Sequence, residues 1–163
     1  MLYIGVDLGT SAVKLLLMDE NGNIQKIVSK EYPLYFPKPG WSEQQPEDWY
    51  VQSMEGIREL TAECDKSQVA GISFGGQMHG LVALDKDDQV IRPAILWNDG
   101  RTGNQTDYLN QNIGKDKLSE YTANIAFAGF TAPKILWMKE NEPGNYKKIA
   151  KIMLPKDYLA YRL

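Results

Sequence analysis

Short apolar runs alternate with polar turns over the first third of the chain, which is the pattern of a strand meander. Residues 2–6 and 12–18 are apolar and compatible with β-structure, and residues 24–32 alternate loosely between apolar and polar side chains. The Asn21-Gly22 dipeptide between the second and third runs is a strong hairpin signal, because both residues tolerate the positive φ angles of a tight turn. We therefore predict three consecutive antiparallel strands.

An amphipathic helix is predicted after residue 45. Pro46 suits a first helical turn, and Glu47 and Asp48 are favourable at the positive end of the helix dipole. The residues that follow recur at helical spacing and predict one buried face. They are Trp49, Ser53, Met54, Ile57 and Leu60.

The remaining pattern predicts an α/β order without an internal repeat or a dividing linker. Residues 69–74 are expected to form a strand, and residues 81–84 and 90–97 a hairpin. The sequence of three strands, a helix and a strand is also the order that opens the ribonuclease-H-like, or actin-like ATPase, fold. We expect further helices at residues 106–113, 116–121, 133–140 and from 156, and a short strand at residues 152–154.

Composition excludes several classes of protein. The chain has 163 residues, 43% hydrophobic and 24% charged, which suits one globular domain. A formal charge of −3 and a pI of about 5.2 give no electrostatic footprint for nucleic acid. No apolar run reaches the roughly 18 residues of a membrane span, and the N-terminus lacks a signal-peptide pattern, so we expect no membrane partner and a cytoplasmic location. The single cysteine, Cys64, excludes an internal disulfide.

The turn between the first two predicted strands carries candidate chemistry. Gly9 would let the backbone approach a triphosphate, and Thr10 and Ser11 could donate hydrogen bonds to it. Asp7 at the strand end could hold Mg²⁺ directly or through its waters, and Lys14 could reach a phosphate. An ordinary glycine turn with solvated polar residues explains this segment equally well. The chain has no Walker A or GxGxxG motif to compete for a nucleotide.

Six segments together give the chain a resemblance to the FGGY carbohydrate kinases of the actin-like ATPase superfamily. The first turn resembles the superfamily's phosphate motif, and residues 76–80, Gly-Gln-Met-His-Gly, are similar to the sugar-contacting loop of the family's xylulose-phosphorylating members. The resemblance implies an actin-like α/β domain with a mixed sheet and helices on both faces. The other four segments are residues 37–44, 93–101, 129–134 and 154–159.

The resemblance also implies roles for single residues. Asp7, Gly9, Thr10, Ser11 and Lys14 fall on the Mg-ATP site, with Asp7 toward the metal. Met78 and His79 fall on the pair that contacts a ketose, where glycerol kinases have Arg-Glu, and this implies D-xylulose as substrate and D-xylulose 5-phosphate as product. The same resemblance places Gln77 and Asp99 near the sugar. Gly129 stands where some relatives have a side-chain substrate contact, which a glycine cannot supply.

The family's general base, an aspartate, and most of its adenine pocket lie in sequence beyond residue 163. We therefore expect residues 1–163 to be the N-terminal actin-like domain of such a kinase, without a catalytic base and inactive alone, and the family implies a homodimer. His79, the only histidine, could also be a structural residue. The alternatives are another family member acting on gluconate, ribulose, fuculose or glycerol, a non-enzymatic actin-like ATPase module, and a ribonuclease-H-like nuclease, which the acidic charge disfavours.

Overall fold

The computed structural model describes residues 1–163, which form two compact units. Unit 1 is built from Met1–Leu34, Gln45–Gln77 and Pro155–Leu163, and unit 2 from Tyr35–Gln44 and Met78–Leu154. Each unit therefore joins segments that are far apart in the sequence.

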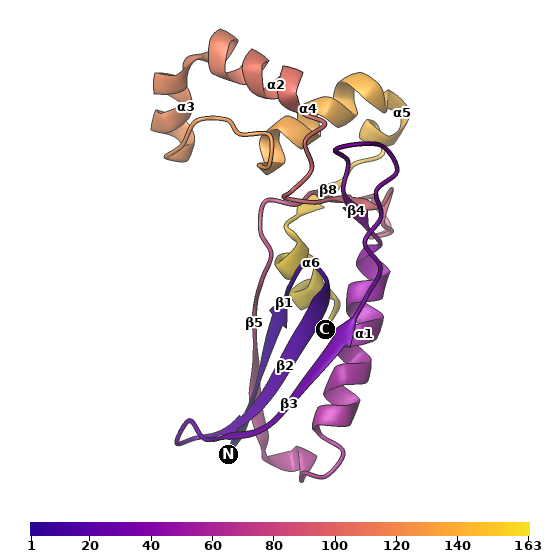
Figure 1. Ribbon diagram of the computed structural model, residues 1–163, viewed down its shortest axis with the longest axis vertical. Helices are drawn as coiled ribbons and strands as arrows, with labels where there is room; N and C mark the ends of the chain where they lie inside the picture. The colour runs from indigo at the N-terminus through magenta and orange to yellow at the C-terminus, as the bar shows by residue number, and fades with distance from the viewer. The chain divides into compact units, whose positions relative to one another are not determined.

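Unit 1 holds a four-stranded mixed sheet with the order β3-β2-β1-β5 (Figure 1). The first three strands are antiparallel, and β5 pairs in parallel with β1. This confirms the predicted meander and the α/β fold class. The strands are β1 (Leu2–Leu8), β2 (Ala12–Asp19), β3 (Ile24–Glu31) and β5 (Val69–Gly76).

One face of this sheet is apolar because side chains alternate along its strands. Ile4, Val6 and Leu8 of β1 are buried, as are Val13, Leu15 and Leu17 of β2. Helix α1 (Pro46–Leu60) covers this face and has Pro46 in its first turn, as predicted. The two layers approach closely, because a Cβ added at Gly56 would lie 2.4 Å from Leu15 Cδ1.

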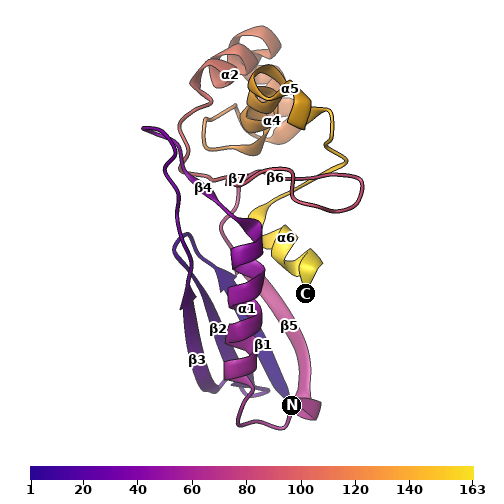
Figure 2. The same ribbon diagram turned by 90° about the vertical axis from the view of Figure 1, so that its right-hand side faces the viewer.

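Helix α6 (Pro155–Arg162) lies beside α1 (Figure 2). The rings of Trp49 and Tyr158 meet edge to face at 6.4 Å, and Arg162 forms an ion pair with Glu47 at 2.7 Å. Both helices thus cover one face, whereas the resemblance implied helices on both. Within residues 1–163 the second face of the sheet is open, and Ile27 on β3 is 61% exposed there.

Short strand pairings organise unit 2, and in each of its two segments they join the beginning of the segment to its end. Tyr35 and Glu43 exchange two backbone hydrogen bonds of 2.9 Å, so the segment from Tyr35 to Gln44 is closed at its base. β6 (Val82–Leu84) pairs antiparallel with β8 (Lys151–Met153), which closes the second segment in the same way. The predicted hairpin of residues 81–97 is present only as isolated bridges. Instead, β7 (Ala94–Ile95) pairs with β4 (Glu43–Gln44).

The helices of unit 2 follow the predicted order with shifted ends. Trp137 and Met138 of α4 (Thr131–Asn141) pack on Leu81, Ala83 and Ile95 to form the core of this unit. A π-helical turn, Leu109–Gly114, occupies part of the predicted first helix. None of the helices combines the length and apolarity needed to cross a membrane. The α-helices of unit 2 are α2 (Gly103–Tyr108), α3 (Lys115–Thr122), α4 (Thr131–Asn141) and α5 (Pro143–Tyr146), and unit 1 adds a 3-10 turn, Lys66–Gln68.

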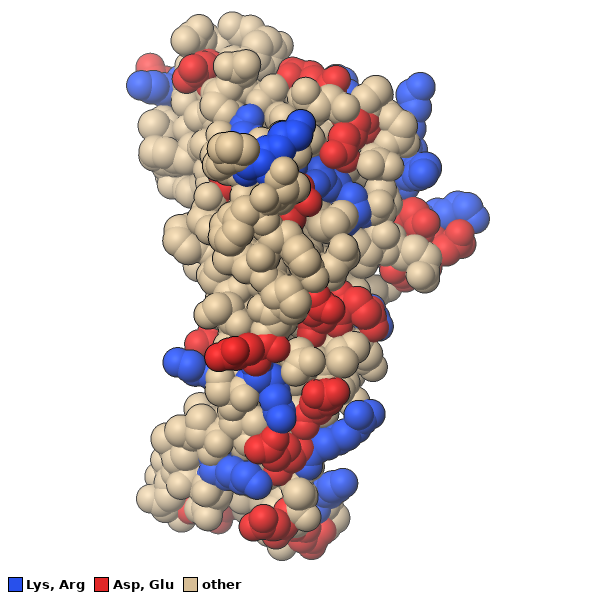
Figure 3. Space-filling view, turned by 45° about the vertical axis from the view of Figure 1, so that its right-hand side comes forward, with Lys and Arg blue, Asp and Glu red and all other residues tan.

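Acidic and basic side chains are interspersed on the face drawn in Figure 3. On unit 1, for example, Lys30 pairs with Glu59 at 2.7 Å across the surface. Such exposed pairs contribute little to stability, so the packed faces described above hold the fold.

Candidate functional site

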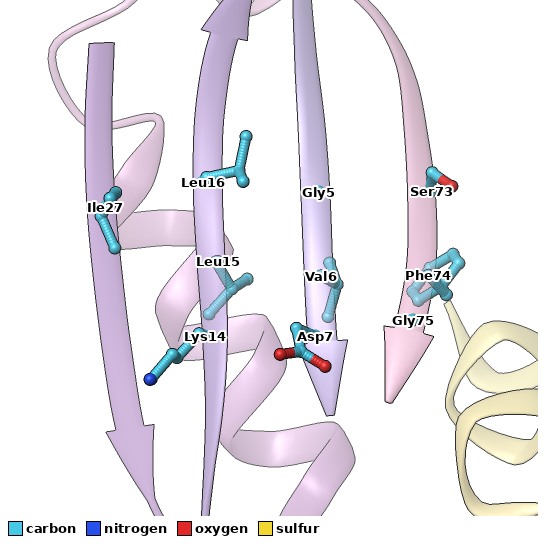
Figure 4. Close-up of a pocket in the computed structure, with 10 residues that line it drawn as sticks. All are labelled: Gly5, Val6, Asp7, Lys14, Leu15, Leu16, Ile27, Ser73, Phe74 and Gly75. Atoms are coloured by element: carbon cyan, nitrogen blue, oxygen red, sulfur yellow. The ribbon is translucent and has the colours of Figure 1, made fainter. Parts of the chain in front are cut away.

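The predicted phosphate site lies at the end of β1. The strand register places Asp7 opposite Lys14 of β2 and beside Gly75 of β5. All three line a pocket of about 410 Å³ on the open face of the sheet (Figure 4). Asp7 and Lys14 are exposed and form no ion pair with each other, so both charges are available to a ligand.

The Gly9 turn is fixed by hydrogen bonds within unit 1. The Gly9 N–H donates to the carbonyl of Ala12 at 3.0 Å, and a Cβ added at Gly9 would lie 2.8 Å from that oxygen. The Gly9 carbonyl accepts from the Tyr32 hydroxyl and from Gln77 Nε2, the latter at 3.2 Å. Burial, with a smaller effect from the nearby charge of Asp7, raises the pKa of Tyr32, which keeps this hydroxyl a donor. Glycine is therefore required by the turn itself, whatever the turn binds.

The loop after β5 begins with an unusually close backbone approach. Gly76 has φ +142°, and a Cβ there would lie 2.5 Å from the Leu8 carbonyl. The Gln77 N–H donates to the same carbonyl at 2.7 Å. The loop is thus anchored to the end of β1 by residues 76 and 77, and Gln77, predicted to contact sugar, has both its N–H and its amide group bonded to the β1 turn.

His79 lies in unit 2, where its ring stacks on an aromatic side chain and its two nitrogens make no hydrogen bond within the protein. It has φ +67°, a conformation that costs a non-glycine residue energy. The imidazole stacks on Phe130 with a centroid distance of 4.4 Å and an angle of 8°, and Phe127 lies 5.1 Å from Phe130. The ring is exposed, and neither of its nitrogens is hydrogen-bonded within the protein. Such a ring can offer a hydrogen bond to a ligand hydroxyl.

Exposed apolar side chains belong to the same unit. Met78 is 49% exposed and Trp97 is 48% exposed. Gly129 lies directly on the backbone of Trp97, because an added Cβ would be 2.6 Å from the Trp97 carbonyl oxygen. A side chain at position 129 is therefore incompatible with this packing, which agrees with the absence of a side-chain contact there.

Asp99 lies inside a buried charged cluster. Its side chain has no exposed surface and accepts hydrogen bonds from Ser42 N at 2.6 Å and from Arg101 Nε at 2.9 Å. The Arg101 guanidinium also pairs with Glu43 at 2.8 Å and lies 3.7 Å from the ring centroid of Trp41. Two of the family-like segments, residues 37–44 and 93–101, thus meet through this cluster, and its observed contacts are internal ones.

Lys134 was not predicted to belong to the site. It is fully buried in the first turn of α4, and its ammonium donates to the carbonyl of His79 at 3.2 Å. The sequence contains a signal for this burial. Lys134 precedes the buried Trp137 and Met138 by three and four residues, which places it on the buried face of the helix.

Comparison with known proteins identifies the class. Residues 2–163 match the N-terminal domain of the FGGY family of carbohydrate kinases, and the chain belongs to this family. It is 50% identical over 162 residues to a xylulose kinase of Bacillus subtilis, covering 98% of this chain and 32% of that protein. A solved xylulose kinase from Brucella ovis is 43% identical with a TM-score of 0.92 over 98% of this chain and 34% of the other. A gluconate kinase from Lactobacillus acidophilus has a TM-score of 0.93 at 30% identity, over 99% and 33%. The chain spans about a third of the length of the curated relatives it matches.

Proposed function

We propose that the protein containing this chain transfers the γ-phosphate of ATP to D-xylulose and forms D-xylulose 5-phosphate in the cytoplasm. The single observation that carries the choice of a sugar acceptor is the exposed imidazole of His79, held flat on Phe130 with both nitrogens unused by the protein. The names of the relatives, several of which are xylulose kinases, support the choice of this ketose.

Asp7 and its neighbours fit a Mg-nucleotide. Residues 1–163 contain no cluster of three or more side chains that could hold a metal by itself. Mg²⁺ needs only one or two protein carboxylates, since it keeps several waters and takes oxygens from phosphates. Asp7 would supply that carboxylate, Lys14 a compensating positive charge, and Thr10 and Ser11 hydroxyl donors to phosphate oxygens. When bound, the metal would neutralise charge that develops on the transferred group.

On the sugar side, we propose that His79 donates a hydrogen bond to a hydroxyl of the ketose or accepts one from it. Met78 packs against the carbon atoms of the sugar. Asp99 acts through Arg101 and Ser42, which it holds in the buried cluster, and Gln77 acts by fixing the loop to the β1 turn. The acceptor hydroxyl of the sugar gives its proton to an aspartate in sequence that follows residue 163, as the family resemblance implies.

The test uses the full-length protein with a panel of xylulose, ribulose, fuculose, gluconate and glycerol, measuring ADP release. D-xylulose should give the highest kcat/KM. A higher kcat/KM for gluconate would contradict this proposal and support gluconate kinase activity, the activity named for one of the similar structures.

Two substitutions at His79 separate hydrogen bonding from packing. His79→Phe keeps a ring that stacks on Phe130 but removes both nitrogens, whereas His79→Ala removes ring and nitrogens together. Both should lower kcat/KM for D-xylulose by roughly 5- to 150-fold, the effect of leaving one hydroxyl unpaired, while the Kd for MgADP is unchanged. A His79→Phe enzyme with normal sugar kinetics would refute a hydrogen-bonding role.

A further inference from the structure

The buried ammonium of Lys134 has carbonyl groups as its only partners. Its Nζ donates to the carbonyls of Phe130 at 3.1 Å, His79 at 3.2 Å and Ala128 at 3.4 Å, and makes a short bond to that of Gly129. No carboxylate lies within ion-pairing distance of it. A buried charge is costly unless it is well hydrogen-bonded. An apolar side chain could fill this space without that cost, so packing alone does not explain why the residue is a lysine.

The segment around Lys134 holds His79 at three points. The His79 carbonyl accepts one hydrogen bond from Lys134 and a second from the Thr131 hydroxyl at 3.1 Å. The His79 ring rests on Phe130, whose own carbonyl is bound to the same ammonium. A residue at φ +67° persists only where its surroundings fix it, and strain of this kind is concentrated at functional sites.

We propose that Lys134 is a positioning residue for the sugar site, in which its ammonium fixes the His79 carbonyl and the 128–130 turn so that the imidazole is presented to the ketose. The inference rests on the proposed function, because it takes His79 as the sugar contact. Lys134 itself does not touch the substrate, since its side chain is fully buried.

Burial also changes the protonation equilibrium of Lys134. Burial lowers its pKa to about 7, the positive charge of Arg101 acts in the same direction, and the negative charge of Asp99 opposes both. The four carbonyl oxygens favour the ammonium, because they can only accept hydrogen bonds. In either charge state the amine keeps N–H groups that can donate to the carbonyls of residues 79 and 128–130.

The experiment is a double-mutant cycle on the full-length kinase. Lys134→Met removes the donor with little change in length, and Lys139→Met, an exposed lysine of the same helix, is the matched control. Lys134→Met should lower kcat/KM for D-xylulose by about 10-fold, in the range of one or two lost hydrogen bonds, with the KM for MgATP within about two-fold. In the His79→Ala background the same substitution should cost less than about two-fold, because the group through which it acts is gone.

Thr131 provides a second cycle should Lys134→Met fail to fold. Thr131→Val removes the other donor to the His79 carbonyl while keeping the shape of the side chain, and Thr131→Ser keeps the hydroxyl. The valine variant should lose about 3-fold in kcat/KM for the sugar and the serine variant nothing, again only when His79 is present.

The outcomes separate the two hypotheses. If His79→Ala lowers kcat/KM but the effect of Lys134→Met or Thr131→Val is undiminished in that background, the positioning role is refuted and the sugar contact stands. If His79→Ala leaves the sugar kinetics unchanged, the proposed sugar contact fails, and the positioning role fails with it.

Discussion

Replacing Arg101 by methionine tests the buried cluster of unit 2. Arg101 has 1% of its side chain exposed, and it links Asp99, which has none, to Glu43. Methionine would still pack against Trp41, so the main loss is the charge partnership and not a cavity. The two carboxylates would remain buried with fewer donors.

The free-energy cost of Arg101→Met depends on which donors remain for the two buried carboxylates. Breaking a buried ion pair by removing one partner costs about 3–5 kcal/mol. Asp99 would keep the backbone N–H groups of Ser42 and residue 101, and Glu43 would keep Arg92. We therefore expect a value near the lower limit, about 3 kcal/mol, which corresponds to roughly 100-fold faster local amide exchange.

The measurement is hydrogen exchange by mass spectrometry on the full-length protein, read on peptides that cover residues 40–44 and 94–101. The double variant Asp99→Asn with Arg101→Met removes both charges and should recover a large part of the lost protection. Lys86→Met, which removes an exposed pair with Asp87, should leave exchange unchanged. Exchange within two-fold of wild type in Arg101→Met, or no recovery in the double variant, would show that the cluster does not hold these segments together.

Two further predictions concern Asp7 and Lys134. In the full-length enzyme, Asp7→Asn should lower kcat by about 10²–10³-fold with little change in the Kd for D-xylulose, because it removes one electrostatic group that serves the transferred phosphate. Steady-state kinetics and a sugar titration measure these two quantities. A raised Kd for the sugar with a normal kcat would contradict the prediction. For Lys134, the unfolded chain keeps its proton up to the ordinary pKa of 10.5 while the folded chain releases it near 7, so the unfolded state binds more protons between these values and the free energy of unfolding rises with pH there. Thermal denaturation from pH 7 to 9.5 should show the melting temperature of wild type rising relative to Lys134→Met, and a constant difference would show that Lys134 does not titrate in this range.

The elements of unit 1 could be predicted because each depends on a local pattern. The alternation of Ile4, Val6 and Leu8 fixes which face of β1 is buried, and Pro46 sets the start of α1. Asp7 lies at the end of β1 and Gly9 in the turn that follows, as expected, since a strand end and a turn are defined by neighbouring residues. That these residues bind phosphate stays a prediction.

The arrangement of unit 2 could not be predicted, because its decisive contacts are short and distant in sequence. β4 and β7 are two residues each and pair across about fifty intervening positions, so neither has a periodicity to detect. Asp99 resembles a site residue in the sequence, and only the structure shows that Arg101 and Ser42 surround it. Lys134 was overlooked because a lysine is ordinarily assigned to the solvent side of a helix.

The two segments of unit 2 are each closed by backbone pairing between residues at or near their two ends, and this has a consequence for how the protein can evolve. Tyr35 is bonded to Glu43, and Val82 to Met153, so each time the chain leaves unit 1 it returns beside its own point of departure. The entropy of closing a loop grows only slowly with its length, and here the closure is made by the strand pair itself. Residues can therefore be gained or lost between these pairs without changing the register of β1, β2, β3 and β5.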